Sequence, residues 1–380
     1  MSFRRPLRCC LAAALLLASC DSLVEPEEWG SVPRLWRTPY THDYWFDGQP
    51  AVEGERVFGG IAGDAVALDA RTGEVLWRTR VRGTNTSLAS RNILVRDGEV
   101  YLAEVDAVYS LDAATGAVRW RAPLPDQADY ARSALDERAF YVGTWGGRVH
   151  ALARADGAVL WTADLGAEWP AATQRRVNGI TWAGDTLYVA AERTRVPNTS
   201  FITGLVVALD ARTGREIWRY EGPNPQNENA IIAPPAVAGS RVLAVEGGRV
   251  AFAIGLDRAT GRELWRTPLA ASSGIDHELV VVGGIAYGGS SDTKVHAFDV
   301  ETGRVIWSRS GRGSSIRTLA ACGNWLLAGD QGLRVYDRRT GEVLAAIVNR
   351  EEDFITSGFA VQGDRFFAFS TKAVYGFRCG

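Results

Sequence analysis

One phrase recurs along the chain and constrains its fold more than any other feature: Leu-Asp-Ala, then Thr-Gly, then a Trp four residues after the glycine. Five clear copies are ALDARTGEVLW (Ala67–Trp77), SLDAATGAVRW (Ser110–Trp120), ALDARTGREIW (Ala208–Trp218), GLDRATGRELW (Gly255–Trp265) and AFDVETGRVIW (Ala297–Trp307). Two degenerate copies are ALARADGAVLW (Ala151–Trp161) and VYDRRTGEVLA (Val335–Ala345). A repeat of about forty residues made of short strands is typical of a β-propeller.

Each copy predicts one blade. Upstream of the motif lie two apolar segments around a tight turn, as in LVRDGEVYLA at Leu94–Ala103. We therefore expect four antiparallel strands per blade, A to D, with the motif forming strand C, the C–D turn and strand D. The motif Asp would cap amides of the turn, the Gly would adopt a positive φ, and the Trp would fill the space between neighbouring blades.

The two ends of the chain together predict an eighth blade. KAVYGFRCG (Lys372–Gly380) aligns with LRVYDRRTG (Leu333–Gly341), which puts Gly376 in an eighth Asp position and leaves that blade without a strand D. PRLWRTPY (Pro33–Tyr40) matches EVLWRTRV (Glu74–Val81) and supplies the missing strand, with Trp36 as its Trp. We expect an all-β, eight-bladed propeller of four-stranded antiparallel blades over residues 33–380, whose last blade the N-terminal strand closes so that no sheet edge stays open.

The first residues predict export and lipidation. Residues 1–19 combine early arginines with a short apolar stretch, Leu11–Ala18, too short to span a bilayer. Leu17-Ala18-Ser19-Cys20 resembles a bacterial lipobox, which implies cleavage before Cys20 and lipidation of its thiol; an ordinary secretory signal is the alternative. Residues 20–32 would then link the propeller to a lipid anchor facing the periplasm. Asp21 leaves the choice between inner and outer membrane open.

Two cysteines remain in the expected propeller. Cys322 falls in the A–B turn of the seventh blade, and Cys379 lies just after strand C of the eighth. These positions belong to adjacent blades and to the same face, so a disulfide is expected in an oxidising compartment. Two free thiols are the alternative.

Longer segments between strands B and C, or between D and the next A, all belong to one face. They are Thr38–Pro50, Asp164–Asn178, Glu192–Thr203 and Glu221–Ile232. Loops on a rigid scaffold often carry binding function, and exposed aromatic and Arg side chains are typical of protein interfaces. The candidate partner-binding residues are Tyr44, Trp45, Trp169, Arg175, Arg176, Arg193 and Arg195. Neutral surface insertions are the alternative.

The sequence contains no recognisable catalytic set. Its 42 basic and 44 acidic residues nearly cancel, which argues against nucleic acid as a partner. The four histidines (His42, His150, His277 and His296) are scattered without metal-ligand spacing. Nucleophile elbows and phosphate-binding loops are also absent from the sequence. We therefore predict no enzyme activity, no cofactor and no metal site.

The repeat resembles that of pyrroloquinoline-quinone (PQQ) propellers over Trp36–Phe377. Quinoprotein dehydrogenases with this repeat carry a vicinal cysteine disulfide and calcium ligands, whereas this chain has adjacent cysteines only at Cys9 and Cys10, inside the signal segment. A PQQ-dependent oxidoreductase or quinone-linked redox sensor is one alternative function. A glycan or peptidoglycan binder that uses Trp45 and Trp169 is another.

With a lipobox and eight blades, the chain resembles the BamB family of accessory lipoproteins of the outer-membrane β-barrel assembly machine. That resemblance implies a monomeric, non-catalytic scaffold in the cell envelope. Its loops on one face would bind the periplasmic domains of the barrel-forming subunit. Arg175 or Arg176 lies near the place of the family's partner-binding Arg, although the surrounding motif differs.

Overall fold

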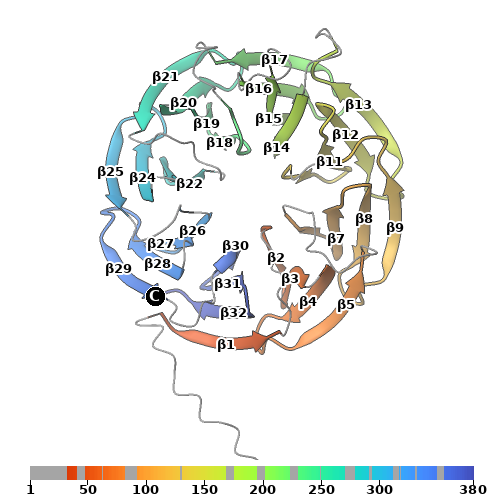
Figure 1. The fold of residues 1–380 in the computed structure, drawn as a ribbon, viewed down its shortest axis with the longest axis vertical. Coiled ribbons are helices and arrows are strands. Elements are labelled where there is room, and N and C mark those ends of the chain that lie inside the picture. The colour runs from red at the N-terminus through yellow and green to blue at the C-terminus, as the bar shows by residue number, and fades with distance from the viewer. Residues whose placement is uncertain are drawn as a thin grey trace, which may run out of the picture.

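Eight four-stranded sheets form a closed ring in the computed structural model (Figure 1). Every pairing between named strands is antiparallel, and the strands run from the inner strand A of each blade to the outer strand D. The predicted all-β, eight-bladed propeller is confirmed. The structure describes residues 32–40, 48–61, 63–81, 92–128, 131–167, 175–194, 202–222, 230–248, 250–269, 279–290, 293–310, 316, 318–329, 332–348 and 355–380.

The blades are numbered in chain order, and each takes four strands. Blade 1 comprises β2 (Ala51–Glu53), β3 (Arg56–Ile61), β4 (Asp64–Asp69) and β5 (Val75–Arg80), and blade 2 comprises β6 (Leu94–Arg96), β7 (Glu99–Ala103), β8 (Ala107–Asp112) and β9 (Val118–Pro123). Blade 3 comprises β10 (Ala134–Leu135), β11 (Ala139–Gly143), β12 (Arg148–Ala153) and β13 (Val159–Asp164), and blade 4 comprises β14 (Arg175–Ala183), β15 (Thr186–Thr194), β16 (Ile202–Asp210) and β17 (Glu216–Glu221). Blade 5 comprises β18 (Ala236–Ala238), β19 (Arg241–Glu246), β20 (Ala251–Asp257) and β21 (Glu263–Leu269), and blade 6 comprises β22 (Val280–Val282), β23 (Ile285–Gly289), β24 (Lys294–Asp299) and β25 (Val305–Ser310). Blade 7 comprises β26 (Thr318–Cys322), β27 (Trp325–Gly329), β28 (Gly332–Asp337) and β29 (Val343–Val348), and blade 8 comprises β30 (Ile355–Gln362), β31 (Arg365–Ser370), β32 (Ala373–Arg378) and β1 (Arg34–Pro39).

The N-terminal strand closes the ring as predicted. β1 pairs with β32, and Trp36 lies opposite Gly376 in the register. In Figure 1 the first and last coloured segments of the chain meet in this blade. Blade 8 therefore draws strand D from one end of the chain and strands A to C from the other.

The register of blade 8 corrects one prediction. Gly376 was expected in the Asp position, but it lies opposite Trp36, the place that Ala67 holds opposite Trp77 in blade 1. The Asp position is therefore taken by Arg378, which pairs with Arg365 as Asp69 pairs with Arg56. A shift of two residues keeps every side chain on the same face of a strand, so the apolar pattern alone could not detect it.

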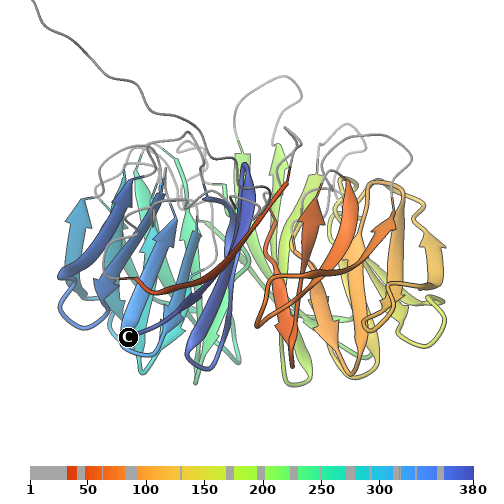
Figure 2. The same cartoon turned by 90° about the horizontal axis from the view of Figure 1, so that it is seen from below.

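Short turns form one face of the ring, hereafter the turn face, along the lower edge of Figure 2. In blade 1 the Oδ1 atom of Asp69 accepts hydrogen bonds from the amides of Arg71 and Thr72, each 2.8 Å long. Gly73 follows with φ of 76°, a conformation that favours glycine. The predicted Asp cap and glycine turn are confirmed, and equivalent caps recur at Asp112, Asp210, Asp257, Asp299 and Asp337.

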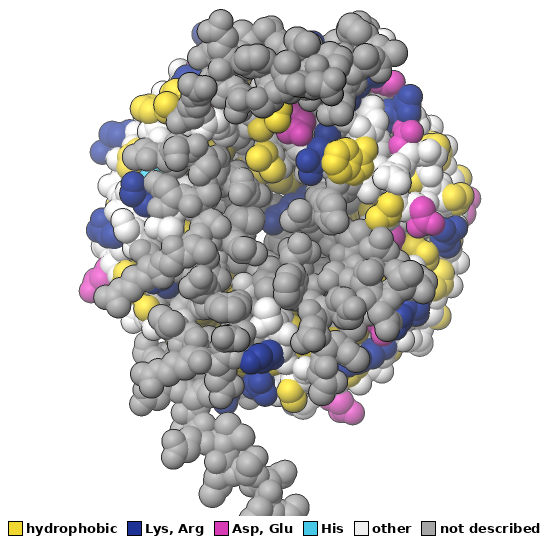
Figure 3. All heavy atoms as spheres, in the orientation of Figure 1, with side chains coloured by type: hydrophobic (Ala, Val, Ile, Leu, Met, Phe, Trp, Pro, Cys, Tyr) yellow, Lys and Arg dark blue, Asp and Glu magenta, His cyan; other side chains and the backbone are white. Residues whose placement is uncertain are grey.

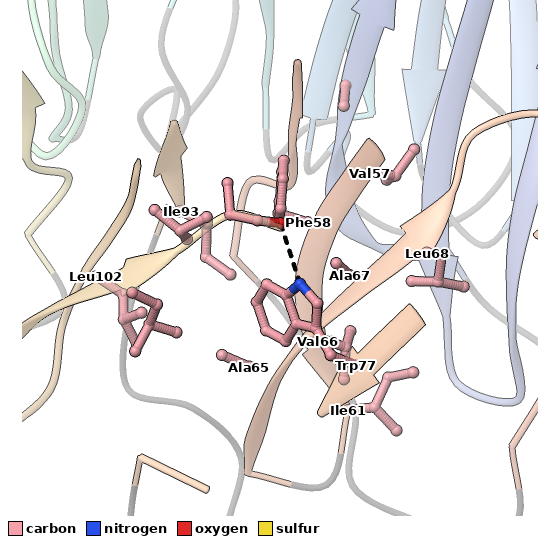
Figure 4. Close-up of a cluster of buried hydrophobic side chains, with 14 of the residues drawn as sticks. Val57, Phe58, Ile61, Ala65, Val66, Ala67, Leu68, Trp77, Ile93 and Leu102 are labelled. Atoms are coloured by element: carbon pink, nitrogen blue, oxygen red, sulfur yellow. Dashed lines mark hydrogen bonds between the residues drawn. The ribbon is translucent and has the colours of Figure 1, made fainter. Parts of the chain in front are cut away.

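The motif Trp of one blade packs against the motif Gly of the next, as blades 1 and 2 show, which confirms its predicted packing role. Trp77 of blade 1 belongs to a buried apolar cluster and donates from Nε1 to the carbonyl of Ala113 in blade 2 over 3.1 Å (Figure 4). A Cβ atom added to Gly116 of blade 2 would lie 2.6 Å from the Trp77 ring. The motif Gly is therefore needed twice, for its positive φ and for the approach of the Trp of the preceding blade. We call this contact the Trp–Gly lock.

Blade 4 is the tallest blade. Its strands β14, β15 and β16 have nine residues each, against two, five and six for the corresponding strands of blade 3. Parts of the segments expected as loops are therefore strand: Arg175–Asn178 begin β14, and Glu192–Thr194 end β15. In Figure 2 these strands rise on the side opposite the turn face. We call this side the loop face.

Candidate functional site

Three of the seven predicted partner-binding residues come together on the loop face of blade 4. Arg175 pairs in register with Arg193, and Arg176 with Glu192, where β14 begins and β15 ends. Their guanidinium groups thus lie on neighbouring strands at one edge of the blade. The other four predicted residues, Tyr44, Trp45, Trp169 and Arg195, lie outside the described residues, as does Cys20.

Arg175 ends a line of alternating charges that runs from blade 3 to blade 4. Its Nη1 atom lies 3.2 Å from Asp164 Oδ1. Asp164 also lies 3.4 Å from Arg148 Nε, and Arg148 Nη1 lies 2.5 Å from Asp126 Oδ2. The hydrogen bond and charge of Asp126 raise the pKa of Arg148. The network joins the first residue of β12 and the last residue of β13 to the first residue of β14.

Trp145 is the main feature that the sequence analysis missed. It lies in the β11–β12 loop, its side chain is 51% exposed, and the Arg176 guanidinium carbon lies 4.8 Å from its ring centroid. This is cation–π geometry. Arg176 also forms an ion pair with Glu192, in which Nη1 and Oε1 are 3.8 Å apart. The signal in the sequence was a Trp outside the motif position, within the short loop Thr144-Trp145-Gly146-Gly147.

Backbone hydrogen bonds make the Trp145 loop rigid. The Trp145 amide donates to the carbonyl of Gln127 over 3.1 Å. Gly147 and Val177 both donate to the carbonyl of Thr144, also over 3.1 Å, and Val177 belongs to β14 of the next blade. The exposed indole is therefore carried by backbone that is bonded on both sides.

Arg193 completes the charged part of this surface with a 2.8 Å contact to Glu221 at the end of β17. Each of the four arginines on this surface thus has a carboxylate partner. The charged members of the surface are Arg148, Arg175, Arg176 and Arg193 with Asp126, Asp164, Glu192 and Glu221. Four positive and four negative groups balance, so this set of ion pairs carries no net charge.

Exposed apolar side chains add to the surface around Trp145. Among the large hydrophobic residues that are exposed in the described part of the chain, Trp145, Ile232 and Val250 alone lie outside the D strands. Ile232 precedes β18 and Val250 precedes β20, so both belong to the loop face of blade 5. In Figure 3, hydrophobic, basic and acidic side chains lie side by side on this face. We call Trp145, Arg176, Arg193, Ile232 and Val250, with the ion pairs above, the blade 3–5 surface.

Hydrogen bonds between blades hold this surface in a fixed frame. The Asn178 side chain of blade 4 donates to the carbonyl of Ile231, next to Ile232, over 2.8 Å. Arg132 of blade 3 and Asn178 are linked through their backbones, and Ile180 donates to the carbonyl of Arg132 over 2.9 Å. Blades 3, 4 and 5 are thus joined to one another by hydrogen bonds at or just before their inner strands.

A buried charge network connects blades 4 and 5. Glu246 is fully buried, and its Oε2 atom lies 2.7 Å from Arg266 Nη1. The Tyr220 hydroxyl of β17 donates to Glu263 over 2.6 Å and accepts from Arg266 over 2.7 Å. Burial, with the charge of Glu246, raises the pKa of Tyr220. The network stabilises the junction between blades 4 and 5, the two blades that contribute Arg193, Ile232 and Val250 to the blade 3–5 surface.

The two histidines in the described ranges, His150 and His296, are both buried. His150 is buried, its Nδ1 lies 2.9 Å from Thr162 Oγ1, and burial lowers its pKa. His296 makes the same 2.9 Å contact with Ser308. Within the described ranges, no three His, Cys, Asp or Glu side chains are grouped as metal ligands would be. Nor does that part of the chain contain a helix with the length and apolar character needed to cross a membrane.

The family model described as outer membrane protein assembly factor BamB matches residues 31–167, 89–309 and 247–374. A protein of that name from Yersinia pestis is 25% identical over 333 residues, which are 81% of this chain and 72% of the relative.

Two solved structures share the fold. BamB from Moraxella catarrhalis superposes with a TM-score of 0.69 at 17% identity and covers 91% of this chain and 99% of its own. The quinohemoprotein alcohol dehydrogenase from Comamonas testosteroni has a TM-score of 0.70 at 15% identity, over 91% of this chain and 76% of the enzyme. At such identities each likeness concerns the fold alone.

Proposed function

Because the chain belongs to the family of the outer membrane protein assembly factor BamB, we propose that it is a non-catalytic scaffold that docks an envelope protein during outer-membrane β-barrel assembly. The observation that carries this proposal is the exposed, rigidly held Trp145 with the Arg176 guanidinium on its ring. The partner that we propose is the periplasmic part of the barrel-forming subunit. The docking site is the blade 3–5 surface.

Trp145 has the properties of an interface hot spot. Trp and Arg dominate the energetics of protein interfaces, particularly where they are held in their bound conformation beforehand. The Trp145 backbone is fixed by hydrogen bonds to Gln127 and through Thr144, and Arg176 restrains the ring itself. Little conformational entropy is then lost when a partner covers the indole.

The charges of the surface favour a protein over a polyanion. Within the described residues of this surface, all four arginines are matched by carboxylates of the chain, so these groups add no net positive charge that would attract nucleic acid or an anionic lipid. Apolar contacts at Trp145, Ile232 and Val250 would supply the affinity, and the ion pairs around them would set orientation. Binding at this surface should therefore depend only weakly on salt.

Membrane attachment is part of the proposal. The lipobox-like end of residues 1–19 favours lipidation of Cys20, which would hold the propeller at a membrane on the periplasmic side. Metabolic labelling with a radioactive fatty acid tests this step. Wild type should be labelled and Cys20→Ser should not be; a label that persists in the variant contradicts lipidation at Cys20.

The docking test is crosslinking in membranes followed by co-purification, comparing Trp145→Ala with Val159→Ala. Val159 is 52% exposed, as Trp145 is at 51%, but it lies on the outer strand β13 of the same blade. We expect the Trp145 variant to weaken capture of the barrel-forming subunit by roughly 30-fold, as loss of a hot spot does. The Val159 variant should capture it normally. Equal capture by both variants and wild type, or no envelope protein captured by wild type, would overturn the proposal.

A further inference from the structure

Seven of the eight junctions between blades carry the Trp–Gly lock, and the junction between blades 7 and 8 does not. The locks join Trp36 to Gly73, Trp77 to Gly116, Trp120 to Gly157, Trp161 to Gly214, Trp218 to Gly261, Trp265 to Gly303, and Trp307 to Gly341. In blade 7 the Trp position opposite Val335 is taken by Ala345. A methyl group cannot fill the space of an indole or donate its hydrogen bond.

Cys379 stands at the other side of this exceptional junction. Its amide donates to the carbonyl of Asp364 over 2.7 Å, as Ala70 donates to Glu55 over 2.9 Å in blade 1. Cys379 therefore holds the position of Ala70, whose carbonyl accepts the Trp36 Nε1 hydrogen bond over 3.1 Å. The residue that would receive a lock from blade 7 is thus a cysteine.

The structure pairs Cys379 with Cys322, the last residue of strand A in blade 7. Their Cα atoms are 6.2 Å apart, within the range that a disulfide spans. At two other junctions the equivalent positions are joined by hydrogen bonds. Arg154 Nη2 donates to the carbonyl of Arg96 over 3.3 Å, and Arg258 Nη2 donates to that of Ala183 over 3.0 Å.

We propose that the Cys322–Cys379 disulfide replaces the missing Trp–Gly lock, so that completion of the ring includes an oxidation step. The two thiols are far apart in sequence, with a separation of 57. They meet only when β30, β31 and β32 have packed against blade 7, since Phe359 and Phe366 share an apolar cluster with Leu327. The bond therefore forms on the assembled junction and holds it closed.

The chemistry of the step is thiol–disulfide exchange. One thiolate attacks a disulfide oxidant and forms a mixed disulfide, releasing one thiol; the second cysteine then attacks the protein sulfur of that mixed disulfide and releases the other thiol of the oxidant. The Sγ–Sγ bond forms, the two cysteines give up two electrons and two protons, and the oxidant is reduced to two thiols. Oxidised glutathione serves as the oxidant in vitro. In bacteria this step belongs outside the cytosol, where disulfides persist.

Peptide mapping of the unreduced protein, together with thermal melting, tests the proposal. We expect a Cys322–Cys379 crosslinked peptide. Cys322→Ser, Cys379→Ser and the double variant should each lower Tm by about 4–10 °C, and by the same amount, because each removes one shared bond. Reductant should lower the wild-type Tm to that of the double variant and leave the double variant unchanged. Trp307→Ala, at the neighbouring junction, should lower Tm and keep the wild-type response to reductant.

Hydrogen exchange locates the effect without any substitution. Reduction of the folded wild type should accelerate amide exchange in β29, β32 and β1, and leave exchange in blades 3 to 5 unchanged. Two free thiols in the purified oxidised protein would overturn the proposal. So would a bond whose reduction changes neither Tm nor exchange at the junction between blades 7 and 8.

Discussion

The two junctions that flank blade 8 hold the ends of the chain by different chemistry. Between blades 8 and 1, the Trp36 ring packs on Gly73, and its Nε1 donates to the carbonyl of Ala70. Between blades 7 and 8, Ala345 stands in the Trp position, and the connection that we propose is the bond between Cys379 and Cys322. The difference shows that a lock needs two matched positions, one on each blade. Where the large side chain is missing, we propose that the disulfide supplies the connection instead.

A third kind of junction lies between blades 4 and 5. Trp218 makes its lock with Gly261 there, and the Glu246–Arg266–Tyr220 network adds a charged connection. This junction also supports the blade 3–5 surface. Substitutions at the junctions between blades 8 and 1 and between blades 4 and 5, and in a turn of blade 2, rank the contributions of apolar packing, buried charge, turn geometry and Asp capping.

The largest effect is expected for Trp36→Ala. Trp36 is 8% exposed, and its removal eliminates both the packing on Gly73 and the hydrogen bond to Ala70. Chemical denaturation should show a loss of roughly 3–5 kcal/mol in the free energy of unfolding. Trp29→Ala, in the expected linker and outside the described residues, should change it little. If the two variants were equally harmless, the N-terminal strand would not be closing the ring.

Removal of Arg266 should cost about 3 kcal/mol, because Arg266→Ala leaves the Glu246 carboxylate buried without its cationic partner. The control is Arg71→Ala. Arg71 pairs with Glu55 on the surface, where such pairs contribute less than about 1 kcal/mol. Urea denaturation of both variants measures the difference. Equal losses would mean that the junction between blades 4 and 5 gains nothing from the buried charge.

Gly73→Ala separates close packing from backbone conformation. Its Cβ would lie 2.5 Å from Trp36 Cε3, at a φ of 76°, so we expect a loss of about 2–4 kcal/mol. Gly54 has a φ of 59° and no atom within 4 Å of an added Cβ, so Gly54→Ala should cost only about 1 kcal/mol. Thermal melts of the pair give the difference. Identical melting temperatures would mean that the Trp36 ring moves aside freely.

The smallest effect is expected for the Asp caps, and it depends on pH. Hydrogen bonds from Arg119 and Thr115 lower the pKa of Asp112 to about 2. The ordinary pKa of an unfolded Asp is near 3.9. The stability that Asp112 contributes is therefore present above about pH 4, and it is lost as the pH falls toward 2. Asp112→Asn keeps an acceptor oxygen but cannot titrate, so its Tm should fall less steeply over this range. Parallel pH profiles for variant and wild type would contradict the role of the carboxylate.

The sequence by itself determined the blades, their number and the way the ring closes. The Asp cap and the glycine turn are local, because Asp69 contacts amides two and three residues away. Each repeat therefore shows its turn chemistry directly, and the match of Pro33–Tyr40 to Glu74–Val81 was sufficient to place the N-terminal strand.

Tertiary structure alone decided the contacts that join distant residues. The register of β32 placed Arg378, not Gly376, in the Asp position, because a shift of two residues preserves the facing of every side chain. The stacking of Arg176 on Trp145 depends on how blade 4 sits beside blade 3, and the burial of Glu246 depends on how blade 5 sits beside blade 4. Repeat sequences specify each blade through local hydrogen bonds. The surface that we propose as a docking site depends instead on how neighbouring blades pack against one another.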